Sequence, residues 1–224
     1  MITLHNLVYT RGHRIAWLLE ELGVEYEIKN YHRDSKTYQV PKDFSEVHPL
    51  ALSPVITDGD VKLGESGAIM EYILNKYGDG QLVPKMLTPE WTQYIYWWHA
   101  SEATFMGVLF AKRILNKAQE VSKFPDKMVL GMVKKKLNAV LLDHRMASPL
   151  DLAEETLKKQ KWFAGDEFTA ADIMMSVPLI FCRNMGELGS GYPKIKEFIK
   201  RVEERPAFQR ANEKAYPIEL GWVD

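Results

Sequence analysis

The apolar positions of the first 80 residues follow two different spacings in alternation. Residues 2–5 alternate between apolar and polar, which is typical of a strand, and residues 25–31 do so again. Between them, apolar residues recur three and four positions apart over 15–22, the stripe of an amphipathic helix that Gly23 ends. A strand, a helix and a strand in this order predict a parallel pair joined by a right-handed crossover.

The rest of the first 80 residues predicts a short helix, a β-hairpin and a further helix. A short helix is expected at residues 42–47. Two apolar runs, 55–57 and 61–63, flank an Asp-Gly-Asp sequence, which is a hairpin signal. A further helix runs from residue 65 until Gly78 ends it. The order β-α-β-α-β-β-α predicts a small α/β domain over residues 1–80.

The remaining residues follow helical spacing. Residues 81–88 contain proline and have no periodicity, so we interpret them as a linker. Apolar residues at helical spacing then predict helices at 91–117, 127–146, 150–161, 170–185, 193–204 and 206–215. Residues 89–224 are therefore expected to form an all-α domain.

One helix start in this second domain has a complete capping signature. Thr169 is the expected N-cap, and Asp172 stands three residues later where the capping box places an acid. Phe168 and Ile173 flank the pair as a hydrophobic staple. We interpret this segment as structural.

Composition narrows the class of protein. Hydrophobic residues make up 46% and charged residues 26%, as in an ordinary soluble globular protein, and the net charge of −1 argues against a nucleic-acid partner. Cys182 is the single cysteine, which excludes a disulfide within the chain and a cysteine-based metal site. The longest apolar run, residues 173–182, is too short for a membrane span. We expect a cytoplasmic protein.

Two hydroxyl-bearing residues lie where the first strand turns into the first helix. Thr10, with Tyr9 before it, stands close to the helix N-terminus, so its hydroxyl could donate to a bound thiolate. The alternative is that Thr10 only caps the helix. The six histidines show no metal-binding spacing, and we expect no metal site.

Two further segments could bind a ligand. Pro54 directly precedes a strand; a cis peptide there would leave the backbone of Ser53 free to pair with an extended peptide, whereas a trans bond would make a simple turn. Glu65 and Ser66 open the third helix, where free N–H groups attract a carboxylate and Glu65 could face an ammonium group. Ordinary capping is the alternative at this second segment.

Four motifs together carry a family resemblance that covers essentially the whole chain. They are residues 14–23, 48–55 and 65–69 and the Thr169…Asp172 box. In this order and spacing the chain resembles the cytosolic glutathione S-transferases, of the fungal and bacterial type with a serine-like catalytic position. The resemblance implies a thioredoxin-like first domain, a helical second domain, a homodimer, a role in detoxification and glutathione as co-substrate, with no bound cofactor.

The resemblance also implies roles for residues of the first domain. Thr10 falls where the serine-type classes place the hydroxyl that activates the thiol, and Tyr9 is the neighbouring candidate. Glu65 and Ser66 would hold the γ-glutamyl end of glutathione. The backbone of Ser53, before a cis Pro54, would pair with the cysteinyl part.

Other implied roles are more distant from the motifs. Relatives often place a basic residue for the glycine carboxylate where this chain has Leu52, so Lys42 or His48 would have to replace it. Glu102 matches an acid that reaches the glutathione amine of the other protomer. The electrophile pocket would draw on the side chains of Trp98, Phe105 and Met106.

The implied function is conjugation of the glutathione thiolate to hydrophobic electrophiles. Two alternatives stay open at this point. One is a non-enzymatic glutathione-binding or interaction module of the same fold, and the other is a glutathione-dependent peroxidase.

Overall fold

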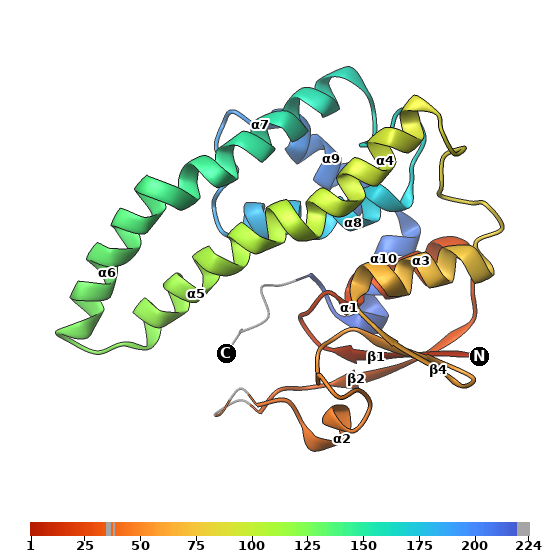
Figure 1. The fold of residues 1–224 in the computed structure, drawn as a ribbon, viewed down its shortest axis with the longest axis horizontal. Coiled ribbons are helices and arrows are strands. Elements are labelled where there is room, and N and C mark those ends of the chain that lie inside the picture. The colour runs from red at the N-terminus through yellow and green to blue at the C-terminus, as the bar shows by residue number, and fades with distance from the viewer. Residues whose placement is uncertain (35–36, 38, 219–224) are drawn as a thin grey trace.

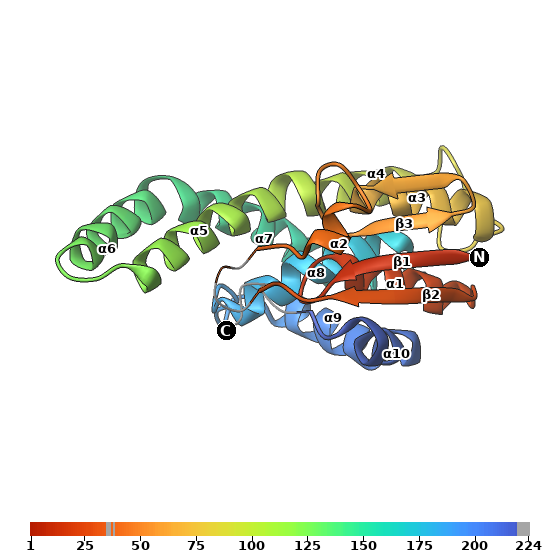
Figure 2. The same ribbon diagram turned by 90° about the horizontal axis from the view of Figure 1, so that it is seen from below.

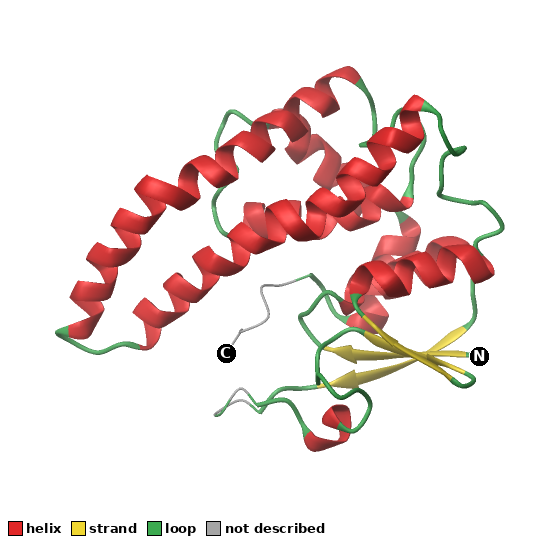
Figure 3. Cartoon of the chain, in the orientation of Figure 1, coloured by secondary structure: helices red, strands yellow, loops and turns green. Residues whose placement is uncertain are grey.

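The molecule consists of a four-stranded sheet with its covering helices and a group of longer helices beside it (Figure 1). The computed structural model describes residues 1–34, 37 and 39–218; residues 35, 36, 38 and 219–224 of the two predicted domains lie outside them. Within the described residues, the strands all belong to the N-terminal part of the chain (Figure 3). The predicted α/β domain followed by an all-α domain is confirmed.

The sheet contains the parallel pair and the hairpin that the sequence predicts. Its strands are β1 (Ile2–Leu7), β2 (Tyr26–Tyr31), β3 (Val55–Asp58) and β4 (Val61–Gly64), in the order β2-β1-β3-β4. β1 is parallel to β2, whereas β3 is antiparallel to both β1 and β4. Gly59 has φ +60° in the turn between β3 and β4, a conformation that glycine adopts without strain.

Helices cover both faces of this sheet. α1 (Gly12–Leu22) and α3 (Ser66–Tyr77) lie on one face, and the short α2 (Lys42–Ser45) lies on the other (Figure 1). Gly23 ends α1 in the left-handed conformation, as the sequence predicts. On the opposite face, Phe44 of α2 packs with Leu7 and Val55 in a small buried cluster.

Two long helical rods form a hairpin that extends away from the sheet (Figures 1 and 2). In the first rod, α4 (Pro89–Ala100) continues through a π-helical turn, η1 (Ser101–Met106), into α5 (Gly107–Val121). In the second rod, α6 (Asp126–Leu137) continues through η2 (Asn138–Leu142) into α7 (Asp143–Lys159).

The second rod differs from the prediction of separate helices at 127–146 and 150–161. Pro149 lies inside α7, where it removes one backbone hydrogen bond. Met146 and Leu150, on either side of it, are each only 1% exposed. Burial of this apolar stripe offsets the lost hydrogen bond, and the helix continues.

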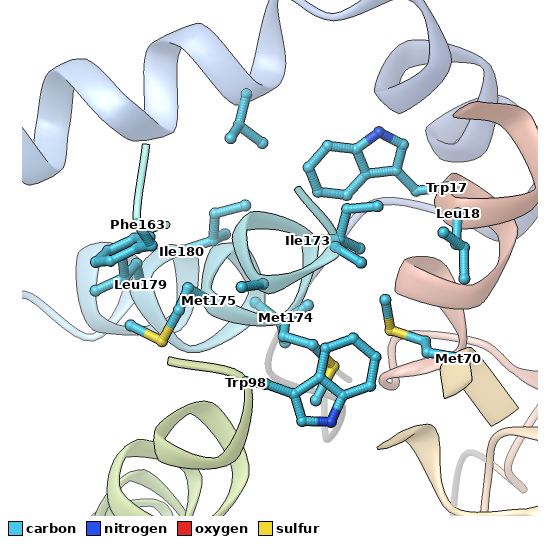
Figure 4. Packing of buried hydrophobic residues seen from close by; sticks show 14 of the residues in the cluster. Trp17, Leu18, Met70, Trp98, Phe163, Ile173, Met174, Met175, Leu179 and Ile180 are labelled. Atoms are coloured by element: carbon cyan, nitrogen blue, oxygen red, sulfur yellow. The ribbon is translucent and has the colours of Figure 1, made fainter. Parts of the chain in front are cut away.

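α8 (Ala170–Asn184) is the central helix of the core. Thirteen of its residues, from Ala170 to Cys182, are buried. In Figure 4, Ile173 and Met174 of α8 lie between Trp17 of α1 and Trp98 of α4, with Met70 of α3 nearby. The two domains therefore share one apolar core.

The predicted capping box begins α8. The backbone N–H of Thr169 donates to Asp172 Oδ2 at 2.8 Å, and the Thr169 hydroxyl donates to the same oxygen at 3.0 Å. The backbone N–H of Phe163 donates to the other carboxylate oxygen at 2.8 Å. This cap fixes where the buried helix starts, so the interpretation as a structural element is confirmed.

The last helices return the chain to the sheet. α9 (Pro193–Glu203) is followed by α10 (Pro206–Ala215), whose Phe208 meets the ring of Trp17 edge-on at 5.0 Å. The buried Asn6 amide of β1 donates to the carbonyl of Ala215 at 3.0 Å and to Asn30 Oδ1 at 2.8 Å. Helix α10 thus packs on the first domain, although the sequence assigns it to the second. Among the described helices, none combines the length and the apolar character needed to cross a bilayer.

Candidate active site

A cavity of about 490 Å³ lies where the carboxyl end of β1 meets the helical domain. The first domain contributes the start of α1 and two loops, and the helical domain contributes η1, α5 and α8. The lining residues are Leu7, Tyr9, Thr10, Arg11, Arg33, Leu52, Ser53, Glu102, Met106, Gly107, Leu109, Phe110, Arg113 and Phe181. Five of the residues predicted from the sequence therefore meet in one place: Tyr9, Thr10, Ser53, Glu102 and Met106.

Thr10 is held between the end of β1 and the start of α1. Its hydroxyl donates to the Leu7 carbonyl oxygen at 2.6 Å and lies 3.0 Å from Ser53 Oγ. Because the single hydroxyl proton of Thr10 is committed to Leu7, the Ser53 hydroxyl is the donor between the two side chains. The backbone N–H of Gly12, the first residue of α1, donates to the Thr10 hydroxyl at 3.4 Å, so the alternative that Thr10 only caps the helix stays open. Tyr9 precedes it with φ +60° and packs edge-on against Tyr216.

Ser53 connects the cavity to the sheet. Its Oγ accepts the backbone N–H of Leu7 at 3.0 Å, which fixes the loop before β3 against the end of β1. The peptide bond between Ser53 and the buried Pro54 is cis, the alternative that the sequence left open. Leu52, just before them, also lines the cavity.

Glu65 and Ser66 lie at the N-terminus of α3, outside the lining of this cavity. Glu65 is exposed with φ +67°, a strained backbone conformation for a residue with a side chain. Ser66 is 2% exposed, and its Oγ has no hydrogen-bond partner among the residues that the structure describes. A buried hydroxyl without a partner is costly, so this helix start is prepared to receive a polar ligand group.

Two other predicted residues lie beside this helix start. A Cβ atom on Gly64 would be 3.4 Å from His48 Nε2, so the imidazole ring lies against the residue preceding Glu65. A Cβ atom on Gly67 would be 3.7 Å from Trp98 Nε1. Lys42 is exposed at the start of α2 and does not line the cavity.

Glu102 joins two arginines of the first domain to the helical domain. Arg11 Nη1 and Arg14 Nη1 each donate to one of its carboxylate oxygens. Arg14 is completely buried, and its Nη1 also lies 3.3 Å from the sulfur of Met174. Within the described part of the chain, its Nε and Nη2 have no hydrogen-bond partner. Burial raises the pKa of Glu102, but the charges of Arg14 and Arg11 outweigh it, and the net pKa is lowered.

The three residues predicted for the electrophile pocket do not all line this cavity. Met106 lines the cavity, but Phe105 is completely buried and Trp98 is 8% exposed, and neither lines it. The reason is that the first rod is apolar on several faces, so the sequence does not indicate which face lines a cavity. The cavity is lined instead by Leu109, Phe110 and, from α8, Phe181.

Two arginines that line the cavity are not among the residues predicted from the sequence. Arg33 follows the end of β2, and parallel strands such as β1 and β2 end at the same edge of a sheet, so its position could have indicated it. Arg113 is one turn after Leu109 on α5, and nothing in the local sequence distinguishes it from its neighbour Lys112.

The one cysteine of the chain is not part of this cavity. Cys182 is completely buried, and burial raises the pKa of its thiol to about 12. In the part of the chain that the structure describes, histidine, cysteine and acidic residues form no cluster suited to a metal ion.

Comparison with known proteins places these features in a family. A family model described as glutathione S-transferase, N-terminal domain matches residues 1–75, and one described as glutathione S-transferase, C-terminal domain matches residues 110–206. Glutathione S-transferase 3 of Schizosaccharomyces pombe is 32% identical over 214 residues, covering 96% of this chain and 88% of that protein. Glutathione S-transferase 1 of Saccharomyces cerevisiae is 27% identical and covers 96% and 95%.

Solved structures agree with these relatives. A glutathione S-transferase from Actinobacillus pleuropneumoniae is 29% identical and superposes with a TM-score of 0.78, covering 100% of this chain and 97% of the other. A glutathione transferase homologue from Sulfitobacter, solved with bound glutathione, has the same fold with a TM-score of 0.75 at 22% identity, covering 97% and 99%. By sequence and by fold, this chain belongs to the glutathione S-transferase family.

Proposed function

We propose that the protein is an enzyme that conjugates the thiolate of glutathione to hydrophobic electrophiles. The observation that carries this proposal is the single cavity that joins Thr10 and Ser53 of the first domain to the apolar wall of α5 and α8. A nucleophile bound on the first domain would there meet an apolar substrate bound on the second. The names of the relatives favour this reaction over a non-enzymatic module or a peroxidase.

In this proposal glutathione lies along the edge of the first domain. The γ-glutamyl carboxylate accepts hydrogen bonds from the Ser66 hydroxyl and from the N–H groups at the start of α3. Glu65 faces the ammonium group. The backbone of Ser53 pairs with the cysteinyl part, which directs the sulfur toward Thr10. For the glycine carboxylate, His48 and Lys42 stay as candidates.

The thiol is activated by lowering its pKa. A free thiol with a pKa of about 8.5 is only about 3% ionised at pH 7, and a decrease of about two units makes it roughly three-quarters thiolate. Thr10 supplies a hydroxyl donor when its proton turns from the Leu7 carbonyl to the sulfur, while it still accepts from Ser53. Tyr9 also lines the cavity and is the second candidate donor.

We also propose that the enzyme is a homodimer in the cytoplasm. Two features of the helical domain support the dimer. The first is a shallow apolar groove of about 470 Å³ along the first rod, which Tyr96 and Ile95 line. The second is a set of exposed apolar side chains on the hairpin: Phe110, Ile114, Val121, Phe124, Met128, Val129, Met132, Val133 and Val140.

Glu102 lines the cavity of its own protomer, where it binds Arg11 and Arg14, so a contact with the glutathione amine of the other protomer is not part of this proposal. A reaction that consumes a reduced thiol suits the reducing cytoplasm.

Two measurements on the purified protein test the proposed reaction, and a third, the rate of cumene hydroperoxide reduction, tests the peroxidase alternative. The first is retention on immobilised glutathione, and the second is conjugation of glutathione to 1-chloro-2,4-dinitrobenzene, followed by absorbance. A transferase is retained and forms the conjugate. A binding module is retained without turnover, and a peroxidase reduces cumene hydroperoxide faster than it forms the conjugate; either result would replace the proposal.

A further inference from the structure

The side chain of Ser53 continues the ladder between β1 and β3 beyond its last strand pair. The antiparallel register ends at the pair of His5 and Val55. Two residues beyond this pair, Ser53 stands opposite Leu7. Pro54 lies between and has no N–H to offer to the ladder. At this point Ser53 Oγ replaces a strand carbonyl and accepts the N–H of Leu7 at 3.0 Å.

Three hydrogen bonds close a ring at this edge of the cavity. The Leu7 N–H donates to Ser53 Oγ, and the Ser53 hydroxyl donates in turn to Thr10 Oγ1 at 3.0 Å. The Thr10 hydroxyl donates back to the carbonyl oxygen of Leu7 at 2.6 Å. Because all three donors follow one direction around the ring, the orientation of the Ser53 hydroxyl sets that of the Thr10 hydroxyl.

The two acceptor sites of Thr10 Oγ1 are both engaged. A hydroxyl group has one proton and two lone pairs. The Ser53 hydroxyl uses one lone pair, and the backbone N–H of Gly12, at a longer distance of 3.4 Å, uses the other. In this arrangement Thr10 can donate its proton to a thiolate, but it cannot accept the S–H of a thiol. The difference favours the ionised form of a bound sulfur.

We propose that Ser53 is a positioning residue whose hydroxyl fixes Thr10 as a donor toward the glutathione sulfur. The inference rests on the proposed function, which assigns the backbone of Ser53 to the cysteinyl part of glutathione, and it gives the side chain a separate role. When glutathione binds, the Thr10 proton turns from the Leu7 carbonyl to the sulfur, while the hydrogen bond from Ser53 stays in place. The thiol proton is released to solvent, because both hydroxyl groups keep their own.

Titration of the bound thiol tests this role without turnover. A thiolate absorbs in the ultraviolet, so the absorbance of the enzyme with glutathione bound, followed against pH, gives the pKa of the thiol. Ser53→Ala should raise this pKa by about half a unit to one unit, because Thr10 Oγ1 then has a free lone pair that accepts the S–H. Turnover at neutral pH should decrease by about threefold to tenfold.

Two variants control for a general loosening of the loop before β3. Ser53→Thr keeps the hydroxyl and should retain the titration of the unmodified enzyme. Thr57→Val removes another side-chain link between β1 and β3, the contact of Thr57 Oγ1 with His5 Nε2 at 3.3 Å, outside the cavity lining. It should leave the titration unchanged. Thermal unfolding checks that each variant is folded at the temperature of the titration.

A double variant separates positioning from direct contact with the sulfur. Thr10→Val leaves no hydroxyl to position, so adding Ser53→Ala to it should change the thiol pKa no further. If Ser53→Ala shifts the pKa equally with and without Thr10→Val, Ser53 itself donates to the sulfur and the inference is wrong.

The remaining outcomes separate this inference from the proposed function. A lower kcat at every pH, with an unchanged thiol pKa, would make the Ser53 hydroxyl a support of the loop and overturn the inference but not the transferase. Loss of glutathione binding in folded Ser53→Ala would make the hydroxyl a binding group, and also overturns it. If glutathione bound to the unmodified enzyme titrates like free glutathione, the proposed activation of the thiol fails together with this inference.

Discussion

The hydroxyl of Thr10 donates to the carbonyl oxygen of Leu7 over 2.6 Å, so the proposed catalytic proton is already engaged at the end of β1. Donation to the glutathione sulfur requires an exchange of this hydrogen bond. A thiolate is a stronger acceptor than a neutral carbonyl, which favours the exchange once the substrate is bound.

Replacing Thr10 by valine should therefore impair the chemical step more than binding. Without the donor, the pKa of the bound thiol should rise by about one to two units, and turnover at neutral pH should decrease about tenfold to a hundredfold. Much of the loss should be regained at alkaline pH. The measurement is the pH profile of conjugation.

Two variants control this experiment. Thr10→Ser keeps the hydroxyl and should retain the profile, and Tyr9→Phe should change little. If Tyr9→Phe shifts the profile and Thr10→Val does not, the donor is the tyrosine. If neither shifts it, stabilisation of the thiolate belongs to the backbone N–H groups or to Arg11.

Ser66→Ala should weaken the binding of glutathione without lowering the stability of the fold. The buried Ser66 hydroxyl has no hydrogen-bond partner in the described structure, so its removal should leave the free energy of unfolding unchanged or slightly increased. Binding of glutathione should weaken by about 1–3 kcal/mol, because the ligand carboxylate loses a donor. Calorimetric titration and thermal unfolding check the two halves, and a dissociation constant equal to that of the unmodified protein would place the γ-glutamyl group elsewhere.

Glu102→Ala should destabilise the protein strongly. It leaves the completely buried guanidinium group of Arg14 without its carboxylate, which typically costs about 3–5 kcal/mol. Adding Arg14→Met removes the uncompensated charge and should recover a large part of the loss. Urea unfolding of the two single variants and the double variant measures the coupling, and strictly additive effects would contradict a direct ion pair.

The dimer has a distinct prediction. Tyr96, half exposed in the groove of the first rod, should lie in the interface, so Tyr96→Arg should weaken the dimer at least a hundredfold. Sedimentation of the unmodified protein should give twice 25.8 kDa, and the variant should give the single-chain mass at micromolar concentration. Leu152→Arg, an equally exposed apolar position on α7, should stay dimeric. A single-chain mass for the unmodified protein would refute the dimer.

The lowered pKa of the Asp58 carboxyl leads us to expect that the protein becomes less stable in acid. Hydrogen bonds from Lys76 and Tyr77 lower the pKa of this carboxyl to about 2, and Tyr72 adds a third donor. An acid whose pKa is lower in the folded state stabilises the fold above its unfolded value near 4, and this contribution is lost as the pH falls from about 4 to 2. Asp58→Asn should cost about 1 kcal/mol at pH 7, after allowance for screening around the exposed Lys76, and progressively less below pH 4. Urea unfolding at several pH values checks this trend.

The elements that the sequence predicts well are those with local signals. The Thr169–Asp172 box and the Gly23 cap each depend on a few neighbouring residues, and both are found in the structure. The hairpin around Gly59 is local in the same way. Pro149 is the counter-example, because buried neighbours from distant helices decide that α7 continues through it.

The candidate site is predictable only in part, because its residues come from distant segments. Thr10 follows β1 and Ser53 precedes β3, which is antiparallel to β1. The sequence could therefore indicate that the two residues lie close together at one edge of the sheet. The link between Glu102 and Arg14 spans two domains, and Phe105 faces the core rather than the cavity. Whether a side chain faces the core or the cavity depends on how the two helical rods are oriented relative to the sheet. The pattern of residues along the chain does not specify this orientation.

The hydrogen bond from Asn6 to Ala215 joins β1 to the end of α10. The two residues are far apart in the sequence, so they are synthesised at different times. Translation proceeds from the N-terminus at about 5–20 residues per second, so α1 is made roughly 10–40 s before α10. During that interval the face of Trp17 that packs against Phe208 stays uncovered, and the Asn6 amide lacks its Ala215 partner. On the ribosome, the first domain therefore completes its fold only after α10 has been made.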